Sequence, residues 1–348
     1  MEHLHTIQTF LELLNRPAFC VRDDQIIAVN AQARQRFLEE GDSIEKYLAQ
    51  SVDTYHNFTD GCLFVTLNIL DMPYGATVTK LEECDLFLME QLSDEIRRAL
   101  ALAAQQLREP INLVYSIAEE LKAQPQAAIT KCMNQLHRVV CNMADLTRLD
   151  TQADLFLQPT DLGSVFAETM EKASTLLATA NIQLHYTALP ETIIGFADRD
   201  MLERAVLNLI SNAVKFSKPN SILEATLIRN EQRLQFTLQD NGEGFSQEVL
   251  QTAFARYLRE PSIEDSRHGL GLGLALVSAV ASCHGGTVLI NRPESGGTRV
   301  TLTLTITPCD EISLYSPVKL PISDYTGGYD HALIELSDVL PVSTYKSK

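Results

Sequence analysis

The stretch Asn208-Leu209-Ile210-Ser211-Asn212-Ala213-Val214-Lys215-Phe216 decides the fold of the second half of this chain of 348 residues. On a helix, Asn208 and Asn212 lie four residues apart and share a face. Two neighbouring amides offer neutral oxygens suited to a hydrated Mg²⁺ whose other ligands are phosphates. Lys215 follows within a turn and can meet a phosphate as a point charge. Taken alone, the two amides would fit a helix cap or a solvated helix face equally well.

A second segment, Asp240-Asn241-Gly242-Glu243-Gly244-Phe245, directly follows an expected strand. A carboxylate at a strand end can accept a hydrogen bond from the exocyclic amine of a flat ring. Gly242 and Gly244 would let the backbone close on that ring. The dipeptide Asn-Gly is also favoured in hairpins, so a simple turn is the alternative.

Two further segments complete an ordered set. Phe254-Ala255-Arg256-Tyr257, with Arg259 close behind, is by itself typical of packing plus a surface charge. Gly269-Leu270-Gly271-Leu272-Gly273-Leu274-Ala275 opens an expected helix. Glycines at a helix N-terminus let a phosphate approach free N–H groups and the positive end of the helix dipole.

The regular elements around these segments indicate an α/β layer structure. The expected helices cover 162–178, 199–216 and 272–283, and the expected strands cover 182–186, 224–228, 234–238, 287–291 and 298–306. In their order and spacing, the four segments resemble the N, G1, F and G2 boxes of the nucleotide-binding domain of sensor histidine kinases, gyrase-type ATPases and related chaperones. His284-Gly285-Gly286 resembles the histidine-kinase branch. The resemblance covers about 160–308 closely and 90–157 in architecture.

This resemblance implies a role for each matching residue. The implied ligands of Mg²⁺ and phosphate are Asn208, Asn212 and Lys215. Asp240 would select the adenine of ATP, in a pocket shaped by Gly242 and Gly244. The other implied nucleotide contacts are Gly269, Gly271 and Gly273 at the phosphates, beneath a lid over about 258–268, with Arg256 or Arg259 at the γ-phosphate.

One motif departs from the family. In sensor histidine kinases, the first helix of the dimerising bundle carries His-Glu-Leu-Arg-x-Pro. The matching stretch of this chain is Gln105-Gln106-Leu107-Arg108-Glu109-Pro110. Gln105 stands at the phosphoacceptor position, and its amide nitrogen lacks the free lone pair of an imidazole. Gln106 stands at the position of the acidic general base and is neutral at every pH. Glu109, in place of the usual Thr or Asn, also disfavours a response-regulator phosphatase. His137 is expected at the surface or rim of the second bundle helix.

The region 85–158 is expected to be a helical hairpin. In its second helix, a seam with spacing 3-4-3-4-3 is formed by Ile129, Cys132, Leu136, Val139, Met143 and Leu146. Two helices cannot bury such seams alone, whereas a four-helix bundle in a homodimer can. The alternative is a monomeric hairpin packed on a neighbouring domain.

Residues 1–84 are expected to form a small α/β domain. The expected strands cover 18–21, 26–29, 62–67 and 76–81. A turn at 22–25 joins the first two, Asn30 caps a helix through Phe37, and a turn at 72–75 joins the last two. This order resembles the start of a PAS sensor domain, and an unrelated α/β module fits it equally well.

Composition narrows the classes of function. Hydrophobic residues make up 45% and charged residues 21%, as in globular proteins. A formal charge of −17 disfavours binding to nucleic acid or to an anionic membrane surface. The sequence lacks a signal peptide and any apolar run of about 18 residues that could span a membrane. Seven scattered cysteines without a CxxC pair are typical of free thiols in a reducing compartment, so we expect a cytoplasmic protein.

The sequence therefore predicts a multidomain α+β protein. Its expected parts are a PAS-like domain (1–84), a dimerisation hairpin (85–158), an ATP-binding domain (159–308) and a tail (309–348) with one short amphipathic helix near 331–340. We expect a sensor histidine kinase-like protein that binds Mg-ATP but does not phosphorylate itself, a pseudokinase that pairs with a response regulator or another histidine kinase. The alternative is an enzyme, either a kinase acting in trans on a partner's histidine or a slow ATPase.

Overall fold

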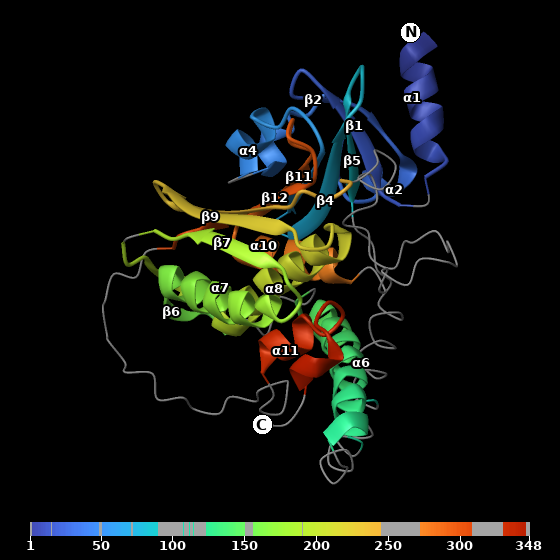
Figure 1. Cartoon of the computed structure of the whole chain (residues 1–348). Coiled ribbons are helices and arrows are strands. Elements are labelled where there is room, and N and C mark those ends of the chain that lie inside the picture. The colour runs from blue at the N-terminus through green and yellow to red at the C-terminus, as the bar shows by residue number, and fades with distance from the viewer. Residues whose placement is uncertain are drawn as a thin grey trace.

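The computed structural model describes residues 2–89 (without 15, 49, 50 and 71), 107, 111, 114, 123–149, 156–189, 191–244, 272–307 and 330–345. Its centre is a ten-stranded sheet. Helices from the C-terminal half cover one face of this sheet, and a further helical layer lies beneath them (Figure 1). Within the residues described, no helix combines the length and apolar character that crossing a bilayer requires.

The first 89 residues contribute five antiparallel strands. Their elements are α1 (Glu2–Glu12), β1 (Ala18–Arg22), β2 (Gln25–Val29), α2 (Ala31–Arg34), α3 (Glu45–Leu48), α4 (Val52–His56), β3 (Cys62–Ile69), β4 (Met72–Lys80) and β5 (Asp85–Met89). The strands lie in the order β2-β1-β5-β4-β3. In their core the rings of Phe19 and Phe87 stack with centroids 4.7 Å apart.

The predicted hairpin at the start of this domain is confirmed. Asp23 and Asp24 form its turn with φ angles of 49° and 60°, as a tight turn between twisted strands requires. Asn30 caps the next helix, because its Oδ1 accepts a hydrogen bond from the Ala33 N–H at 2.9 Å, although the helix ends at Arg34. The turn expected at 72–75 is wrong, since β4 already begins at Met72 and its Pro73 pairs with Asn68.

The second half of the chain supplies the other five strands of the large sheet. Its elements are β6 (Gln158–Asp161), α7 (Leu162–Ala178), β7 (Gln183–Thr187), β8 (Ile194–Ala197), α8 (Arg199–Phe216), β9 (Ile222–Asn230), β10 (Arg233–Gln239), α10 (Gly273–Cys283), β11 (Thr287–Asn291) and β12 (Arg299–Thr305). The sheet continues in the order β11-β12-β10-β9-β7, with β7 parallel to β9. The helices predicted over 162–178 and 199–216 are confirmed at both ends. Sequence analysis missed β6 and β8, which pair in a separate two-stranded sheet.

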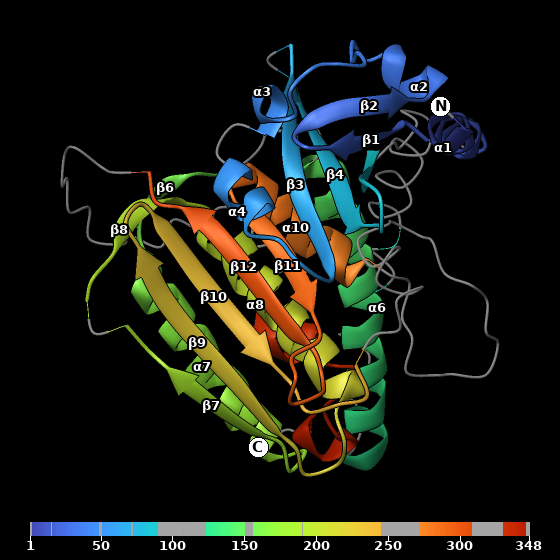
Figure 2. The ribbon, with the colours of Figure 1, turned by 90° about the horizontal axis from the view of Figure 1, so that it is seen from above.

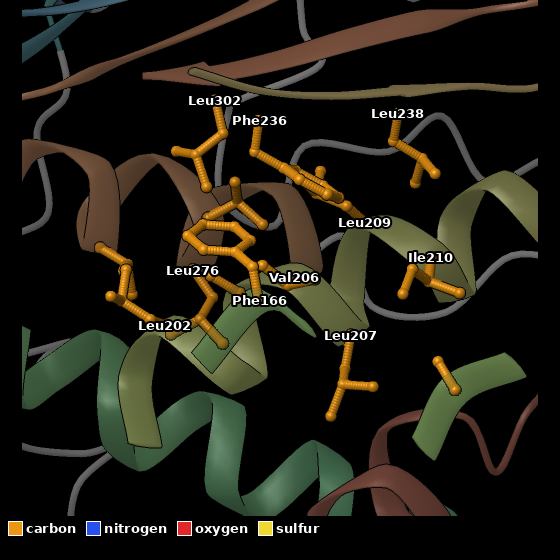
Figure 3. Packing of buried hydrophobic residues seen from close by; sticks show 14 of the residues in the cluster. Phe166, Leu202, Val206, Leu207, Leu209, Ile210, Phe236, Leu238, Leu276 and Leu302 are labelled. Atoms are coloured by element: carbon orange, nitrogen blue, oxygen red, sulfur yellow. The ribbon is translucent and has the colours of Figure 1, made fainter. Parts of the chain in front are cut away.

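Alternation along β10 builds the core of this half. Leu234, Phe236 and Leu238 are buried, while the residues between them are partly exposed, which is the pattern of a strand with one covered face. These side chains meet apolar residues of α7, α8 and α10 (Figure 3). The rings of Phe166 and Phe236 pack with centroids 5.1 Å apart.

The two halves share one sheet because β3 pairs with β11. Phe64, Leu63 and Cys62 lie opposite Val288, Leu289 and Ile290 in antiparallel register. Figure 2 shows β3 running beside β11. Gly61, with a φ of 97°, lies so close to β11 that an added Cβ would sit 2.1 Å from the Ile290 carbonyl oxygen. The backbone approach at this junction therefore needs glycine.

The long helix α6 (Ala123–Leu149) lies beside the C-terminal half. The predicted seam divides between two environments: Leu146 is buried, whereas Leu136 is 53% exposed. The expected surface or rim position of His137 is wrong, since this side chain is 3% exposed. The side of α6 that packs on the rest of the molecule therefore includes the polar residue His137 as well as the seam residue Leu146.

The C-terminal segment 330–345 lies within the predicted tail and contains the short helix expected near 331–340. It forms α11 (His331–Glu335) and a short 3₁₀ helix, η2 (Val342–Tyr345). Ala332, Leu336, Leu340 and Tyr345 belong to the main hydrophobic core. This segment lies against α6 and below α8, drawn in red in Figure 1. The expected helix over 331–340 ends at Glu335.

Candidate functional site

Helix α8 carries the two asparagines, and its N-terminus is fixed by two side chains. Asp198 caps it by accepting a hydrogen bond from the Met201 N–H at 3.1 Å. His284 supports the cap, because its Nε2 lies 3.1 Å from the Asp198 N–H and its Nδ1 lies 2.8 Å from the Val280 carbonyl oxygen. Burial lowers the pKa of His284. A neutral imidazole, with Nδ1 donating and Nε2 accepting, satisfies both contacts.

Asn208 is committed to contacts within the protein. It is fully buried. Its Nδ2 donates to the Arg204 carbonyl oxygen at 3.0 Å and to Glu335 Oε2 at 2.9 Å, and its Oδ1 accepts from Arg138 at 2.9 Å. In this arrangement the amide of Asn208 joins α8 to α6 and α11, and its role toward Mg²⁺ stays a prediction.

Asn212 lies one turn further along α8 and faces a small cavity. Phe216, Leu238, Asp240, Thr298 and Val300 also line that cavity. Gly273, at the start of α10, lies against the same helix face, so that a Cβ there would be 3.0 Å from Asn208 Oδ1 and 3.6 Å from Asn212 Nδ2. The structure thus brings together residues from the first, second and fourth sequence segments.

Asp240 is 4% exposed and ends β10 at the edge of this cavity. Its Oδ1 accepts hydrogen bonds from the backbone N–H groups of Gly242 at 2.8 Å and Thr298 at 3.2 Å. Burial raises the pKa of Asp240 above its ordinary value of 3.8, and the bonds from Gly242 and Thr298 oppose that shift. The protein therefore orients this carboxyl group at a partly desolvated position.

Close backbone contacts hold the turn after Asp240. A Cβ on Gly242 would lie 2.2 Å from the Phe216 carbonyl oxygen, so only glycine lets this turn meet the end of α8. Gly244 follows with a φ of 77°. The alternative of a simple hairpin turn is wrong, because β10 pairs with β12 and β9 and the next described element is α10.

Lys215 forms an ion pair that sequence analysis did not anticipate. Its Nζ lies 2.5 Å from Asp338 Oδ2, and the two side chains are 11% and 28% exposed. Arg138 reaches the same carboxylate oxygen at 2.7 Å. Burial raises the pKa of Asp338, but the charges of Arg138 and Lys215 outweigh it and leave that pKa lowered.

A buried network connects α6, α8 and α11. Glu335 accepts from Arg138 at 3.1 Å and from Arg204 at 2.9 Å. Arg204 also pairs with Asp145 and donates to Asn142 at 3.0 Å. Sequence analysis missed these residues, although the spacing of Arg138, Asn142 and Asp145 by four and three residues places them on one helix face.

The other predicted site residues lie outside the described residues: Gln105, Gln106, Arg256, Arg259, Gly269 and Gly271, together with the lid over 258–268.

The comparisons with known proteins agree with this geometry. Residues 197–308 match the family described as histidine kinase-, DNA gyrase B- and HSP90-like ATPase. Residues 197–308 are thus similar to the ATPase domains of histidine kinases, and two-component sensor kinases are among the relatives of this chain.

Among curated relatives, the sensor protein KdpD of Clostridium acetobutylicum is 29% identical over 216 residues, which are 60% of this chain and 23% of KdpD. The sensor protein RstB of Escherichia coli K12 is 29% identical over 253 residues, 70% of this chain and 54% of RstB. The chain therefore spans about half or less of the length of these relatives. Full-length ShkA, solved in complex with AMPPNP, aligns with a TM-score of 0.50 and 24% identity over 61% of this chain and 46% of ShkA, which supports the fold alone.

Proposed function

We propose that this protein is a sensor histidine kinase-like protein that binds Mg-ATP and does not phosphorylate itself. The observation that carries nucleotide binding is the cavity at the end of β10. There the buried carboxyl group of Asp240 and the amide of Asn212 line the same cavity, beside backbone turns that contain glycine. The match of residues 197–308 to the histidine kinase-, DNA gyrase B- and HSP90-like ATPase family supports the same assignment.

Each residue has a proposed role in this site. The backbone N–H groups of Gly242 and Thr298 both donate to Asp240 Oδ1, so Oδ2 is the oxygen that would accept from the adenine amine. Asn212 would supply a neutral oxygen to Mg²⁺, which suits a cation that prefers oxygen ligands and completes its shell with phosphate and water. Lys215 would pair with a phosphate. The remaining proposed contacts are Gly242, Gly244, Gly269, Gly271 and Gly273, with Arg256 or Arg259 at the γ-phosphate.

Calorimetry with Mg-AMPPNP tests this proposal. We expect Asp240→Asn to weaken binding by about 1–3 kcal/mol, because an amide donor would then face the adenine amine. Asp60→Asn, an exposed substitution in the N-terminal half, is the matched control and should leave the affinity unchanged. Equal affinities for the wild-type protein and Asp240→Asn would remove Asp240 from the site.

The absence of self-phosphorylation rests on Gln105 and Gln106. Because these two positions offer neither a nucleophilic imidazole nor a general base, we expect no acid-labile label from γ-labelled ATP. Restoring the motif with Gln105→His and Gln106→Glu should permit labelling that is acid-labile and base-stable. Labelling of the unmodified chain, lost on changing His137, would show that the acceptor lies elsewhere. Incubation with a candidate partner distinguishes a pseudokinase from a kinase that acts in trans, and phosphate release without labelling would indicate a slow ATPase.

We further propose that the chain forms a homodimer through its helical hairpin. The exposed seam residue Leu136 supports this, since an apolar side chain of that size is 53% exposed on α6. Leu136→Asp should yield monomers in light scattering, while Ala128→Asp, at an exposed position of the same helix outside the seam, should not. If the unmodified protein is monomeric, this assignment fails. The confirmed hairpin and the helix capped by Asn30 support a PAS-like sensor module, and the proposed partner is a response regulator or another histidine kinase.

A further inference from the structure

The C-terminal segment 330–345, here called the clasp, is an ordered part of the molecule. Asp330 caps α11 by accepting from the Ala332 N–H at 2.9 Å. Ala332, Ile334, Leu336 and Leu340 are at most 1% exposed. Lys131 of α6 donates to the Leu340 carbonyl oxygen at 2.7 Å. Both α6 and α8 therefore hold the clasp.

Within the clasp, two carboxylates differ in burial. Glu335 is 1% exposed and receives hydrogen bonds from Arg138, Arg204 and Asn208. Asp338 lies in the turn after α11, is 28% exposed, pairs with Lys215 and Arg138, and accepts from Gln135 at 3.2 Å. Glu335 is thus buried inside the network, whereas solvent reaches Asp338, so a competing anion can approach the partners of Asp338 more easily.

Lys215 connects the clasp to the helix that carries the proposed nucleotide site. It lies three residues after Asn212, which lines the cavity. Its ammonium group pairs with the Asp338 carboxylate at 2.5 Å, and the lysine is only 11% exposed. A phosphate that binds Lys215 would share the ammonium group with this carboxylate and would be repelled by its negative charge, so the two anions compete for one cation.

We propose that the clasp competes with nucleotide phosphate for Lys215, so that the closed clasp lowers nucleotide affinity and bound nucleotide releases the turn around Asp338. This inference rests on the proposed function of Lys215. Coupling between two binding events is reciprocal: if Asp338 weakens nucleotide binding by some factor, nucleotide weakens the docking of Asp338 by the same factor. The two directions can be measured separately.

The first measurement is calorimetry of Mg-AMPPNP binding to Asp338→Asn. The variant keeps the shape of the side chain and removes its charge, so we expect roughly fivefold tighter binding, the lower end of the range for allosteric coupling. Asp338→Glu, which restores the charge, should bind nearly as the wild-type protein does. Glu82→Gln removes one exposed charge from the N-terminal half and controls for the change in net charge.

The second measurement is hydrogen exchange of the wild-type protein with and without Mg-AMPPNP. Within the clasp, the Leu336, Val339 and Leu340 N–H groups bond to carbonyl oxygens of Ala332 and Leu336. Saturating nucleotide should speed their exchange about fivefold if the turn opens. This experiment needs no variant, so it decides the proposal even if Asp338→Asn folds poorly.

The outcomes separate the two proposals. If the wild-type protein binds nucleotide and Asp338→Asn binds it with the same affinity, the competition is overturned and the nucleotide site stands. The same holds if nucleotide slows the exchange at 336–340. Failure of the wild-type protein and of Asp338→Asn to bind nucleotide would instead remove the proposed function, and with it this inference.

Discussion

The two sides of helix α8 are stabilised by different forces. One side packs Leu202, Val206 and Leu209 against the sheet and α10, with no charge involved (Figure 3). The other side directs Arg204, Asn208 and Lys215 at α6 and the clasp, where the three cations Arg138, Arg204 and Lys215 meet the three carboxylates of Asp145, Glu335 and Asp338.

This difference determines how each side responds to change. Loss of apolar contact leaves a cavity, whose cost depends on its size and on how far the neighbours can relax. Loss of one buried charge leaves its partner unpaired in a medium of low dielectric, and that cost is recovered when the partner is removed too. On the apolar side, the loss of stability should therefore follow the volume that is removed. On the charged side, it should follow the charge that is left unpaired.

The largest effect is expected for Arg204→Met. It would leave the buried Asp145 without its arginine and weaken the hold on Glu335, so we expect unfolding by denaturant to show a loss of about 4 kcal/mol. Arg199→Met, on the same helix, removes the exposed partner of Glu168 and should cost less than about 1 kcal/mol.

Combining Arg204→Met with Asp145→Leu sharpens the comparison. Arg138 would still pair with Glu335, so we expect most of the lost stability to return. A double variant as unstable as the single one would show that packing, and not charge balance, governs this side of α8.

A somewhat smaller effect is expected on the apolar side. Leu202 is fully buried, and Leu202→Ala should lower the free energy of unfolding by about 3 kcal/mol. Ile228→Ala is the control, since Ile228 on β9 is 42% exposed and should change stability by about 0.5 kcal/mol or less. If Leu202→Ala costs no more than this control, the apolar side contributes less than its burial indicates.

The smallest effect is a pH dependence of the clasp. His331 Nδ1 lies 3.6 Å from Glu203 Oε2. Burial lowers the pKa of His331, but the hydrogen bond and charge of Glu203 outweigh it and leave that pKa raised above 6.5. Burial raises the pKa of Glu203, but the hydrogen bonds from His331 and Lys172 outweigh it and lower that pKa to about 2. Other charged groups that act on His331 are Asp200 and Arg204. Lys172, the second partner of Glu203, is itself affected by Asp330 and Arg199.

The sign follows from these directions. The His331 contribution is complete below pH 6.5 and is lost as pH rises through its higher folded-state pKa, while the Glu203 contribution is lost only as pH falls below 4.5 toward 2. We expect the clasp to lose roughly 1 kcal/mol between pH 6 and pH 9, the upper end for a partly exposed pair. Hydrogen exchange of the α11 amides measures this, and His331→Gln should flatten the profile. A slope of the opposite sign would contradict the pairing.

The strongly periodic parts of the fold could be predicted from the sequence. The ends of α7, α8 and β11 agree with their predicted bounds. At α8 a side-chain cap from Asp198 marks the predicted start. The strand β5 was assigned to a helix, since its run Leu86, Phe87, Leu88 and Met89 is buried throughout and has no alternation to reveal a strand. Short β6 and β8 carry too few residues for any period to show.

The candidate site divides in the same way. Asp240 and Asn212 belong to local segments whose order is readable along the chain, and the structure gathers them at one cavity. Glu335 lies 127 residues after its partner Asn208, and Asp338 lies 123 residues after its partner Lys215, so no local pattern connects them. Periodicity and turn chemistry describe local segments, so they cannot predict pairs of residues that only the tertiary fold brings together.

The junction between β3 and β11 has a further consequence for association between copies of this protein. A strand at the edge of a sheet exposes unpaired N–H and C=O groups, which can recruit a strand from another molecule. Here each of these two strands covers the edge of the other over Cys62, Leu63 and Phe64. Separation of the halves would create two complementary edges at once, and the same pairing could then form between chains. Gly61 permits this close approach. It thus favours the pairing of β3 with β11 of the same chain over exchange of the N-terminal strands between two copies.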